Sequence, residues 1–273
     1  MNFVEIIFSI WNNINRDIYA YMLKEARHSK ILQALKERQY LSLNDLVEIT
    51  NSSESSVRAD LVTLANEGKL IRLRGGARAL DDAAFSYEPT FESKIKLEVD
   101  GKKRIAEYAA SLVKEDSIIY IDAGTSTYYF VDALKNNKLT VVTNSVILAR
   151  HLKLKGYQVY ITGGEFKLTT DAFIGMMTKE IISKFNFDMG FFGCNGIDLE
   201  KGLTTPDYEE AVVKNTAMNC CRQVYVLADH TKLGVKTAVT FHPFKGKEII
   251  IDRITKKEFK NKGMLEVNKW FTQ

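Results

Sequence analysis

The first candidate for chemistry is a run of hydroxyl residues that directly follows an apolar segment. Residues 117–121 read S-I-I-Y-I, and the next six read D-A-G-T-S-T, which contain Asp122, Gly124, Thr125, Ser126 and Thr127. A glycine lets a ligand approach the backbone, and the amides at the start of a helix attract anions such as phosphate. An ordinary strand-to-helix turn with a Ser or Thr cap has the same composition, so both interpretations stand. The segment is neither a Walker A loop nor a G-x-G-x-x-G fingerprint.

Five further polar clusters lie where predicted strands end or helices begin. They are T-N-S at 143–145, G-G-E at 163–165, C-N-G-I-D at 194–198, T-T-P-D-Y-E-E-A-V-V-K at 204–214 and A-D-H-T-K at 228–232. Each cluster alone could be a turn or a set of surface charges. Because the carboxyl ends of parallel strands meet at one edge of a sheet, we expect a common pocket. Pro206 suits the first position of a helix, on which Asp207, Glu210 and Lys214 would share a face.

Strands and helices alternate over residues 94–273. Apolar runs predict strands at residues 117–121, 139–143, 157–162, 189–194, 224–228 and 248–252, and helical periodicity predicts helices at 103–114, 126–134 and 146–154. This alternation is typical of βαβ units. The predicted class is therefore α/β with a mostly parallel sheet.

A basic segment near the N-terminus has the pattern of a nucleic-acid-binding unit. The first half of residues 53–78 predicts a helix, closed by Gly68, with Val57, Leu61 and Leu64 on its apolar face. The residues near its start that could meet base edges are Ser53, Ser55, Ser56 and Arg58. Residues 69–78 contain no acid and hold, around a Gly-Gly pair, Lys69, Arg72, Arg74 and Arg78. This order suits a helix in the major groove and a basic hairpin on the phosphates, although a small helical domain with a solvated hairpin has the same pattern.

Two predicted helices precede that segment. Residues 27–39 carry an apolar stripe of Ile31, Leu32 and Leu35, and Ser42 with Asp45 has the spacing of a capping box. The second helix should face inward through Leu43, Leu46, Val47 and Ile49, and Ser52 or Ser53 should cap the third. Three helices and a two-stranded hairpin predict a winged helix-turn-helix over residues 22–78, followed by a linker at 79–93 and a second domain at 94–273.

Composition is that of ordinary globular material. The chain has 273 residues, of which 45% are hydrophobic and 26% charged, with a net charge of +4, and this length suits two domains. Three cysteines form neither a disulfide framework nor a C-x-x-C pair, which predicts a cytoplasmic protein. The histidines His151, His230 and His242 are scattered, so we expect no metal and no cofactor.

The first 21 residues form a separate extension. Their apolar run is only about ten residues long, too short to span a bilayer, and it lacks the basic start and cleavage site of a signal peptide. We expect no membrane association. The extension either precedes the true start at Met22 or is an amphipathic helix that packs on a partner subunit.

Three N-terminal segments resemble the DNA-binding domain of the DeoR family of bacterial sugar-operon repressors. They are L-K-E-A-R-H-S-K-I-L at 23–32, L-V-E-I-T-N-S-S-E-S-S-V-R-A-D-L at 46–61 and G-K-L-I-R-L-R-G-G-A at 68–77. T-N-S-S-E-S is similar to the fructose-operon branch. The sequence departs from the family at Ala59, where a second arginine is usual, and at Arg74, where a histidine is usual. These departures put the operator sequence in doubt rather than the activity.

The strand-end clusters resemble the family's effector domain, in the same order, so the resemblance covers residues 22 to about 252. It implies a Rossmann-like domain related to ribose-5-phosphate isomerase that binds a phosphorylated sugar such as fructose 1-phosphate or tagatose 6-phosphate. By motif, residues 124–127 would hold the phosphate. The residues that would line the sugar or the phosphate are Asn144, Asn195, Asp207, Lys214, Asp229 and Lys232.

A regulator is the favoured function, and a sugar-phosphate isomerase is the alternative. The central position of C-N-G-I-D carries Asn195, which cannot accept a proton at neutral pH, and no activated Ser or Cys is evident. A metabolic isomerase also has no use for a winged helix. We therefore expect no catalysis, with operator DNA, a sugar phosphate and further copies of the chain, in a dimer or tetramer, as partners. Repression and activation are not separable from the sequence.

Overall fold

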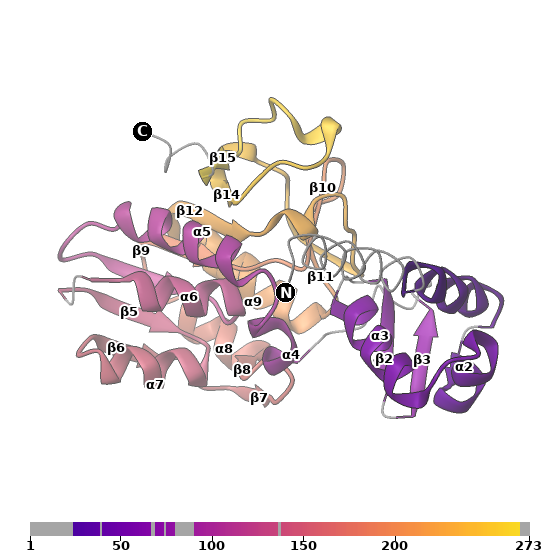
Figure 1. Cartoon of the computed structure of the whole chain (residues 1–273). Helices are drawn as coiled ribbons and strands as arrows, with labels where there is room; N and C mark the ends of the chain where they lie inside the picture. Colours follow the sequence, from indigo (N-terminus) through magenta and orange to yellow (C-terminus); the bar gives the residue numbers. More distant parts are fainter. Residues whose placement is uncertain are drawn as a thin grey trace, which may run out of the picture. The chain divides into compact units, whose positions relative to one another are not determined.

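The computed structural model consists of two compact units, Met1–Ala84 and Phe85–Gln273. It describes residues 24–38, 40–66, 69–73, 75–79, 90–135 and 138–267 (Figure 1). The predicted N-terminal extension, Gly68, Arg74 and most of the predicted linker lie outside the described residues. Each unit has its own core, so each is described by itself.

The described part of the first unit contains three helices and a small sheet. Residues 24–37 are helical, which places helix already before the predicted start at Arg27. They are followed by β1 (Tyr40–Ser42), α2 (Leu43–Thr50), α3 (Glu54–Asn66), β2 (Leu70–Leu73) and β3 (Gly76–Ala79). The antiparallel sheet has the order β1-β3-β2, so the expected two-stranded hairpin gains a third strand.

Apolar packing explains most of this unit. Ile31, Leu46, Val57 and Leu64 share one buried cluster, as predicted. Ile49 was expected to face inward but is 37% exposed. The predicted capping box is confirmed: the Ser42 amide donates to Asp45 Oδ2 at 2.8 Å, and the Asp45 amide donates to Ser42 Oγ at 3.2 Å. Gly76 is required because a Cβ there would lie 2.1 Å from the Leu41 carbonyl oxygen across the β1–β3 pair.

The second unit is built on a seven-stranded sheet of order β15-β14-β12-β9-β4-β5-β6, whose pairings are all parallel. The strands are β4 (Ile118–Ile121), β5 (Thr140–Thr143), β6 (Gln158–Ile161), β9 (Phe187–Phe192), β12 (Cys221–Ala228), β14 (Ile249–Ile251) and β15 (Leu265–Glu266). All six predicted strands are present, and the predicted α/β class with a mostly parallel sheet is confirmed.

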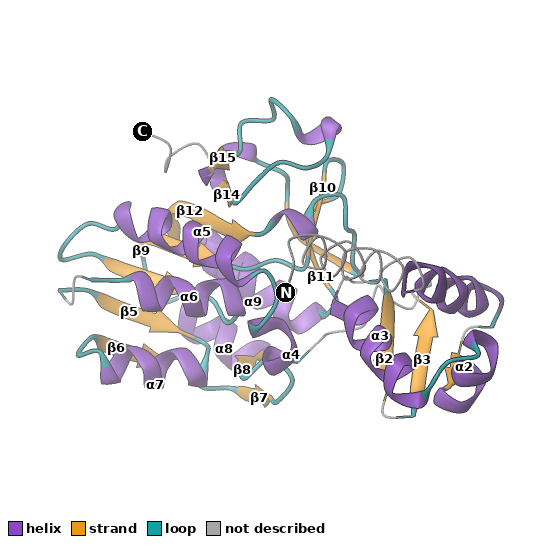
Figure 2. Ribbon diagram, in the orientation of Figure 1, coloured by secondary structure: helices purple, strands orange, loops and turns teal. Residues whose placement is uncertain are grey.

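Helices cover both faces of this sheet (Figure 2). They are α4 (Phe91–Ile95), α5 (Val99–Ser111), α6 (Thr125–Ala133), α7 (Val146–Leu154), α8 (Gly175–Ile182) and α9 (Tyr208–Asn219). Ile119 and Ile121 pack into the cluster that contains residues of α5, α6 and α7, whereas Tyr120 packs into the cluster with α8 and α9. Because both faces are buried, the strands read as continuous apolar runs rather than alternating ones.

Two small sheets were not predicted. A hairpin pairs β7 (Glu165–Lys167) with β8 (Ala172–Ile174), and a second sheet has the order β10-β11-β13 from β10 (Gly196–Asp198), β11 (Gly202–Thr205) and β13 (Val239–His242). Both elements follow strands of the main sheet in the chain, and they contribute side chains to the site described below. No helix in the described part of the chain is long and apolar enough to cross a membrane.

Candidate functional site

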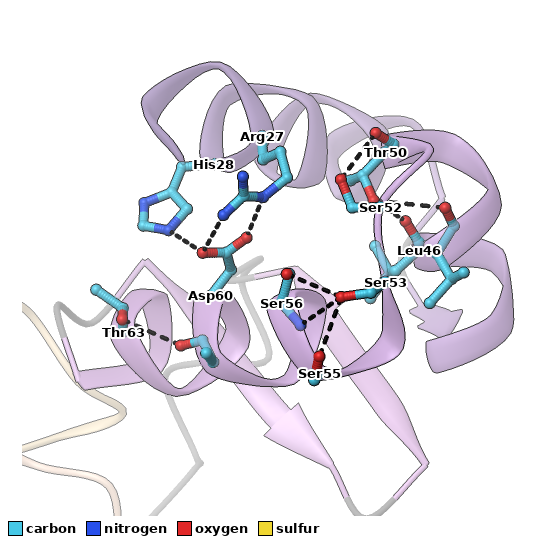
Figure 3. A network of polar contacts seen from close by, with 12 residues as sticks. Arg27, His28, Leu46, Thr50, Ser52, Ser53, Ser55, Ser56, Asp60 and Thr63 are labelled. Atoms are coloured by element: carbon cyan, nitrogen blue, oxygen red, sulfur yellow. Dashed lines mark hydrogen bonds and ion pairs between the residues drawn. The ribbon is translucent and has the colours of Figure 1, made fainter. Parts of the chain in front are cut away.

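The N-terminus of α3 carries a cluster of serine hydroxyls. Ser53 caps the helix, because the Ser56 amide donates to Ser53 Oγ at 3.3 Å. Ser53 Oγ also lies 3.0 Å from Ser55 Oγ and 2.9 Å from Ser56 Oγ (Figure 3). Of the two predicted caps, Ser53 is therefore the one observed. Ser53 and Ser55 are exposed and Ser56 is half-buried, so this end of α3 presents hydroxyls at the surface.

Arg58 lies one turn further along α3 and is held by an acid of the same helix. Its Nε and Nη2 atoms donate to Glu54 Oε1 at 2.8 and 2.6 Å. The two side chains are 50% and 58% exposed, and such exposed pairs contribute little stability, so Arg58 can exchange Glu54 for another partner at small cost.

Asp60 is a buried residue whose importance the sequence analysis missed. Its carboxylate accepts from Arg27 Nε at 2.7 Å and from Arg27 Nη2 at 3.2 Å, and it lies 3.1 Å from His28 Nε2 (Figure 3). The three side chains join the first helix to α3. Asp60 lies next to Leu61 and three residues after Val57, so its place on the apolar face was the available signal.

The predicted basic wing is present, but its arginines differ in exposure. Arg72 is exposed on β2, whereas Arg78 on β3 is half-buried, and within the described residues its buried Nε has no hydrogen-bond partner. Arg74 lies outside the described residues. Lys69 and Arg72 are therefore the wing cations that the described part of the structure places at the surface.

In the second unit, the predicted polar residues converge on the point where the strand order reverses. From β4 the sheet continues to β5 and β6 on one side and to β9, β12 and β14 on the other. In doubly wound sheets, ligands bind beyond the carboxyl ends of strands at this point. Asp122 follows β4 and accepts a hydrogen bond from the Gly193 amide, which follows β9, at 3.1 Å.

Asp122 and Lys214 form a buried ion pair there. Lys214 Nζ donates to Asp122 Oδ2, and the two residues are 5% and 1% exposed. Burial raises the pKa of Asp122, while the Lys214 ammonium and the Gly193 amide oppose that rise. Lys214 thus pairs with a carboxylate of the protein itself, whereas the motif implied that it would line the sugar or the phosphate.

Glu210 is the centre of a second buried network. It accepts from Lys167 Nζ at 3.0 Å and Thr170 Oγ1 at 2.8 Å, both from the β7–β8 hairpin, and from Thr205 Oγ1 at 3.3 Å. Burial tends to raise the pKa of Glu210, but Lys214, Lys167 and the hydroxyl lower it below its ordinary value. These bonds join the β7–β8 hairpin to helix α9 at the site, a contact that the sequence did not predict.

Helix α9 begins at Tyr208, two residues after the predicted start at Pro206. Asp207 is its N-cap, because the Glu210 amide donates to Asp207 Oδ1 at 2.9 Å. Pro206 therefore lies outside α9 instead of at its first position. Asp207 also lies 3.0 Å from Lys167 Nζ.

The two predicted asparagines bond within the protein. Asn144 Oδ1 accepts from the Ala123 amide at 3.1 Å, and its Nδ2 donates to the Phe173 carbonyl at 3.0 Å, which ties the loop after β4 to β8. Asn195 Oδ1 accepts from Thr205 Oγ1 at 3.2 Å. The structure thus gives Asn144 a positioning role beside the loop at residues 122–127.

That loop leads into α6 without a side-chain cap. Gly124 is the N-cap residue, and no side chain accepts from the first-turn amides. Thr127 Oγ1 turns back to the Gly124 carbonyl at 2.9 Å, Thr125 is buried and Ser126 is half-buried. Gly124 rather than a Ser or Thr is therefore the cap residue, and uncapped helix amides of this kind can bind an anion.

A buried lysine that the sequence analysis missed completes the site. Lys102 on α5 is 3% exposed, and burial lowers its pKa to about 8, while Asp229 raises it and Lys232 and Lys94 lower it. Its Nζ donates to the Lys94 carbonyl at 2.7 Å. Lys102 precedes Ile105 and Ala109 by three and seven residues, so helical spacing places it on the apolar face.

The groups after β4, β9 and β12 lie around one thiol. Cys194 has its pKa raised to about 12, chiefly by burial, and the charges that also act on it are those of Lys232, Lys214, Asp229 and Asp122. These residues come from four predicted clusters. The structure therefore brings the strand ends after β4, β9 and β12 and helix α9 close together, and the ligand site expected there stays a prediction.

His230 lies at the border of this site, with Glu98 and Asp252. Among the described residues, these three place possible metal-ligand atoms within 4.8 Å of one another. Arg253 Nη2 lies 2.8 Å from His230 Nε2, which must accept, so His230 Nδ1 donates to Asp252 Oδ2 at 2.9 Å. The proton on Nδ1 and the adjacent guanidinium disfavour a cation, and the contacts position His230.

Comparison with known proteins agrees with this two-part description. The family model described as "DeoR C terminal sensor domain" matches residues 97–253, and the "DeoR-like helix-turn-helix domain" matches residues 27–83. The HTH-type transcriptional regulator FruR of Bacillus subtilis (strain 168), described as uncharacterized, is 38% identical over 82% of this chain and 88% of its own. The lactose phosphotransferase system repressor of Staphylococcus aureus (strain NCTC 8325 / PS 47) is 30% identical over 81% of this chain and 88% of its own.

Solved structures are more distant. Ribose 5-phosphate isomerase A from Methanocaldococcus jannaschii has a TM-score of 0.38 and 15% identity, over 50% of this chain and 54% of the isomerase. A likeness this weak carries no argument about chemistry.

Proposed function

Because the chain belongs to the DeoR family of DNA-binding transcriptional regulators, we propose that it represses a sugar-utilisation operon and that a phosphorylated sugar releases it from the operator. The observation that carries the effector class is the uncapped N-terminus of α6 at the switch point of the sheet. Backbone amides and a helix dipole favour an anion there.

The charges around the site support a ligand that is both anionic and rich in hydroxyls. Lys102 and Lys232 supply cations near the carboxylate of Asp229, which can accept from sugar hydroxyls. We assign the phosphate to residues 124–127 and the sugar to the groups after β9 and β12. Fructose 1-phosphate is the first effector to test, because of the fructose-branch wording of T-N-S-S-E-S and the relative named FruR.

We assign DNA contacts to the exposed residues of the first unit. Ser55 and Arg58 on α3 would meet base edges, and Arg72 would meet phosphate. We also propose a homo-oligomer that acts in the cytoplasm, since helix-turn-helix regulators pair their reading heads on repeated half-sites. Leu168, Met176 and Met177 are 78%, 73% and 63% exposed, which supports burial of that surface against another copy.

No catalytic role is proposed. The carboxylates best placed to act as bases are each tied to a lysine, Asp122 to Lys214 and Glu210 to Lys167. The relatives named above are transcriptional regulators, and none is named as an enzyme.

The test is release of operator DNA by a panel of sugars. Full-length protein is bound to its operator and titrated with fructose 1-phosphate, fructose 6-phosphate, tagatose 6-phosphate and free fructose. We expect one phosphate to release the DNA and free fructose to fail, because the loop binds an anion. Equal release by free fructose would contradict the assignment of residues 124–127.

A further inference from the structure

Helix α4 is the first described element after the segment that joins the two units, and it is only five residues long. A helix this short is not stable by itself, so contacts with the rest of the unit hold it. The Phe91 amide donates to the Thr169 carbonyl at 3.0 Å, and Tyr129 Oη donates to the Ile95 carbonyl at 3.0 Å. Lys102 Nζ donates to the Lys94 carbonyl at 2.7 Å.

Lys102 therefore bonds α4 and also lies near the proposed effector site. Its ammonium bonds a carbonyl near the C-terminus of α4, where a cation is favourable. The same ammonium lies within the electrostatic reach of Asp229 and Lys232, which belong to the effector site. A ligand bound beside Asp229 and Lys232 would therefore act on the same ammonium that bonds α4.

We propose, resting on the function proposed above, that Lys102 relays effector binding to the linker through α4. In the operator-binding state Lys102 caps α4. A bound sugar phosphate takes over the ammonium, because its negative charge attracts the ammonium and the neutral Lys94 carbonyl carries no net charge. α4 then loosens, and the segment that leads to the DNA-binding unit loses its fixed end.

The β7–β8 hairpin provides a second connection to α4. Thr169, which accepts from the Phe91 amide, is followed by Thr170, which bonds the buried carboxylate of Glu210. α4 is thereby held on two sides by groups whose neighbours line the effector site. Coupling requires only that the effector prefers the state in which α4 is loose.

The coupling between α4 and operator binding can be tested with a variant that leaves the effector site unchanged. If effector binding loosens α4, then loosening α4 by another route must shift the equilibrium toward the effector-binding state, which weakens operator binding, strengthens effector binding, or does both. Tyr129→Phe removes the bond to the Ile95 carbonyl and changes no residue assigned to the site. Tyr160→Phe is the matched control, because it removes an exposed bond with Gln158 at 2.9 Å.

The experiment uses full-length protein and measures operator affinity, effector affinity and amide exchange of residues 90–97. The probe is fructose 1-phosphate, or whichever phosphate of the panel releases the unmodified protein. We expect it to speed exchange in α4. Tyr129→Phe should shift the equilibrium by about two- to tenfold, the range for one hydrogen bond, and this shift is measured as weaker operator binding, tighter sugar-phosphate binding, or both. Tyr160→Phe should match the unmodified protein.

Two outcomes would overturn the relay, and they separate it from the proposed function. If a sugar phosphate releases operator while exchange in α4 is unchanged, the function stands and the relay is wrong. The relay is equally wrong if Tyr129→Phe loosens α4 but binds both operator and the sugar phosphate like Tyr160→Phe. If no phosphate of the panel releases the unmodified protein, the proposed function fails and the relay fails with it.

Discussion

At the scale of single residues, Arg58 shows how a side chain can be restrained by its own helix. Glu54 holds the guanidinium at 2.6 Å along the exposed side of α3. An exposed pair of this kind is worth about 0.3–0.5 kcal/mol, whereas a bidentate contact with guanine is worth about 1–3 kcal/mol. Arg58 should therefore leave Glu54 when it meets a matching base and stay paired with Glu54 on other DNA sequences. Glu54 would in this way increase the preference for operator over other sequences.

Replacement of Glu54 tests this interpretation. Glu54→Gln should strengthen binding to unrelated duplexes more than binding to the operator, because it removes a negative charge near phosphate and frees Arg58. Arg58→Ala should instead reduce the preference for operator by about 1–3 kcal/mol. Affinities for operator and for a scrambled duplex, at one salt concentration, measure both effects. An unchanged ratio of the two affinities in Glu54→Gln would contradict the role of the acid.

At the scale of elements, the first helix is fastened to α3 by one buried carboxylate. Asp60 is 1% exposed and holds Arg27 and His28, which lie 33 and 32 residues away in the chain. Loss of one member of a buried pair leaves an uncompensated charge and costs about 3–5 kcal/mol. The loss of a helix cap costs about 1 kcal/mol.

Asp60→Ala should therefore be far more damaging than Ser42→Ala, which removes the cap of α2. For a unit of this size, about 1 kcal/mol lowers the melting temperature by about 4–8 °C. We expect Asp60→Ala to lower the transition of the first unit by more than about 12 °C and Ser42→Ala by less than about 8 °C. A calorimetric scan of the full-length protein measures both, with the transition of the second unit as an internal reference. Equal shifts in the two variants would show that the buried pair contributes no more than a cap.

What the sequence could predict at this scale followed from local periodicity. The apolar runs fixed the central strands to within a few residues, and helical spacing identified α3, α5 and α7. Elements whose partners are distant in the chain were missed: β1 is three residues long and pairs with β3, and the β7–β8 hairpin has an exposed Phe166 and Leu168. Buried charges were missed as well. Asp60 and Lys102 look like solvated charges until their partners are known, and the partner of Lys214 lies 92 residues away.

At the scale of the whole molecule, the pKa of Lys102 predicts how operator release depends on pH. Lys102 has its pKa lowered from 10.5 to about 8, mainly by burial, and the groups that face it are Asp229, Lys232, Lys94 and Glu98. Between pH 7 and 9 most of its charge disappears. A sugar phosphate is already a dianion in this range, because its second pKa is about 6. Effector binding should therefore weaken by up to about tenfold at pH 9, where about one Lys102 in ten stays charged.

A loss of folding stability through Lys102 would not explain weaker effector binding at high pH, because the contribution of Lys102 to stability changes with pH in the opposite direction. The unfolded chain, with an ordinary lysine, binds more protons than the folded chain between pH 8 and 10.5, so this group makes the fold more stable as pH rises. Lys102→Arg is the matched variant, since a guanidinium stays charged throughout. The measurement is the sugar-phosphate concentration that half-releases operator, at pH values from 7 to 9, with operator affinity determined at each pH. The unmodified protein should require progressively more effector, and Lys102→Arg should show a flat profile. Parallel profiles for the two proteins would exclude Lys102 as a cation that contributes to binding of the sugar phosphate.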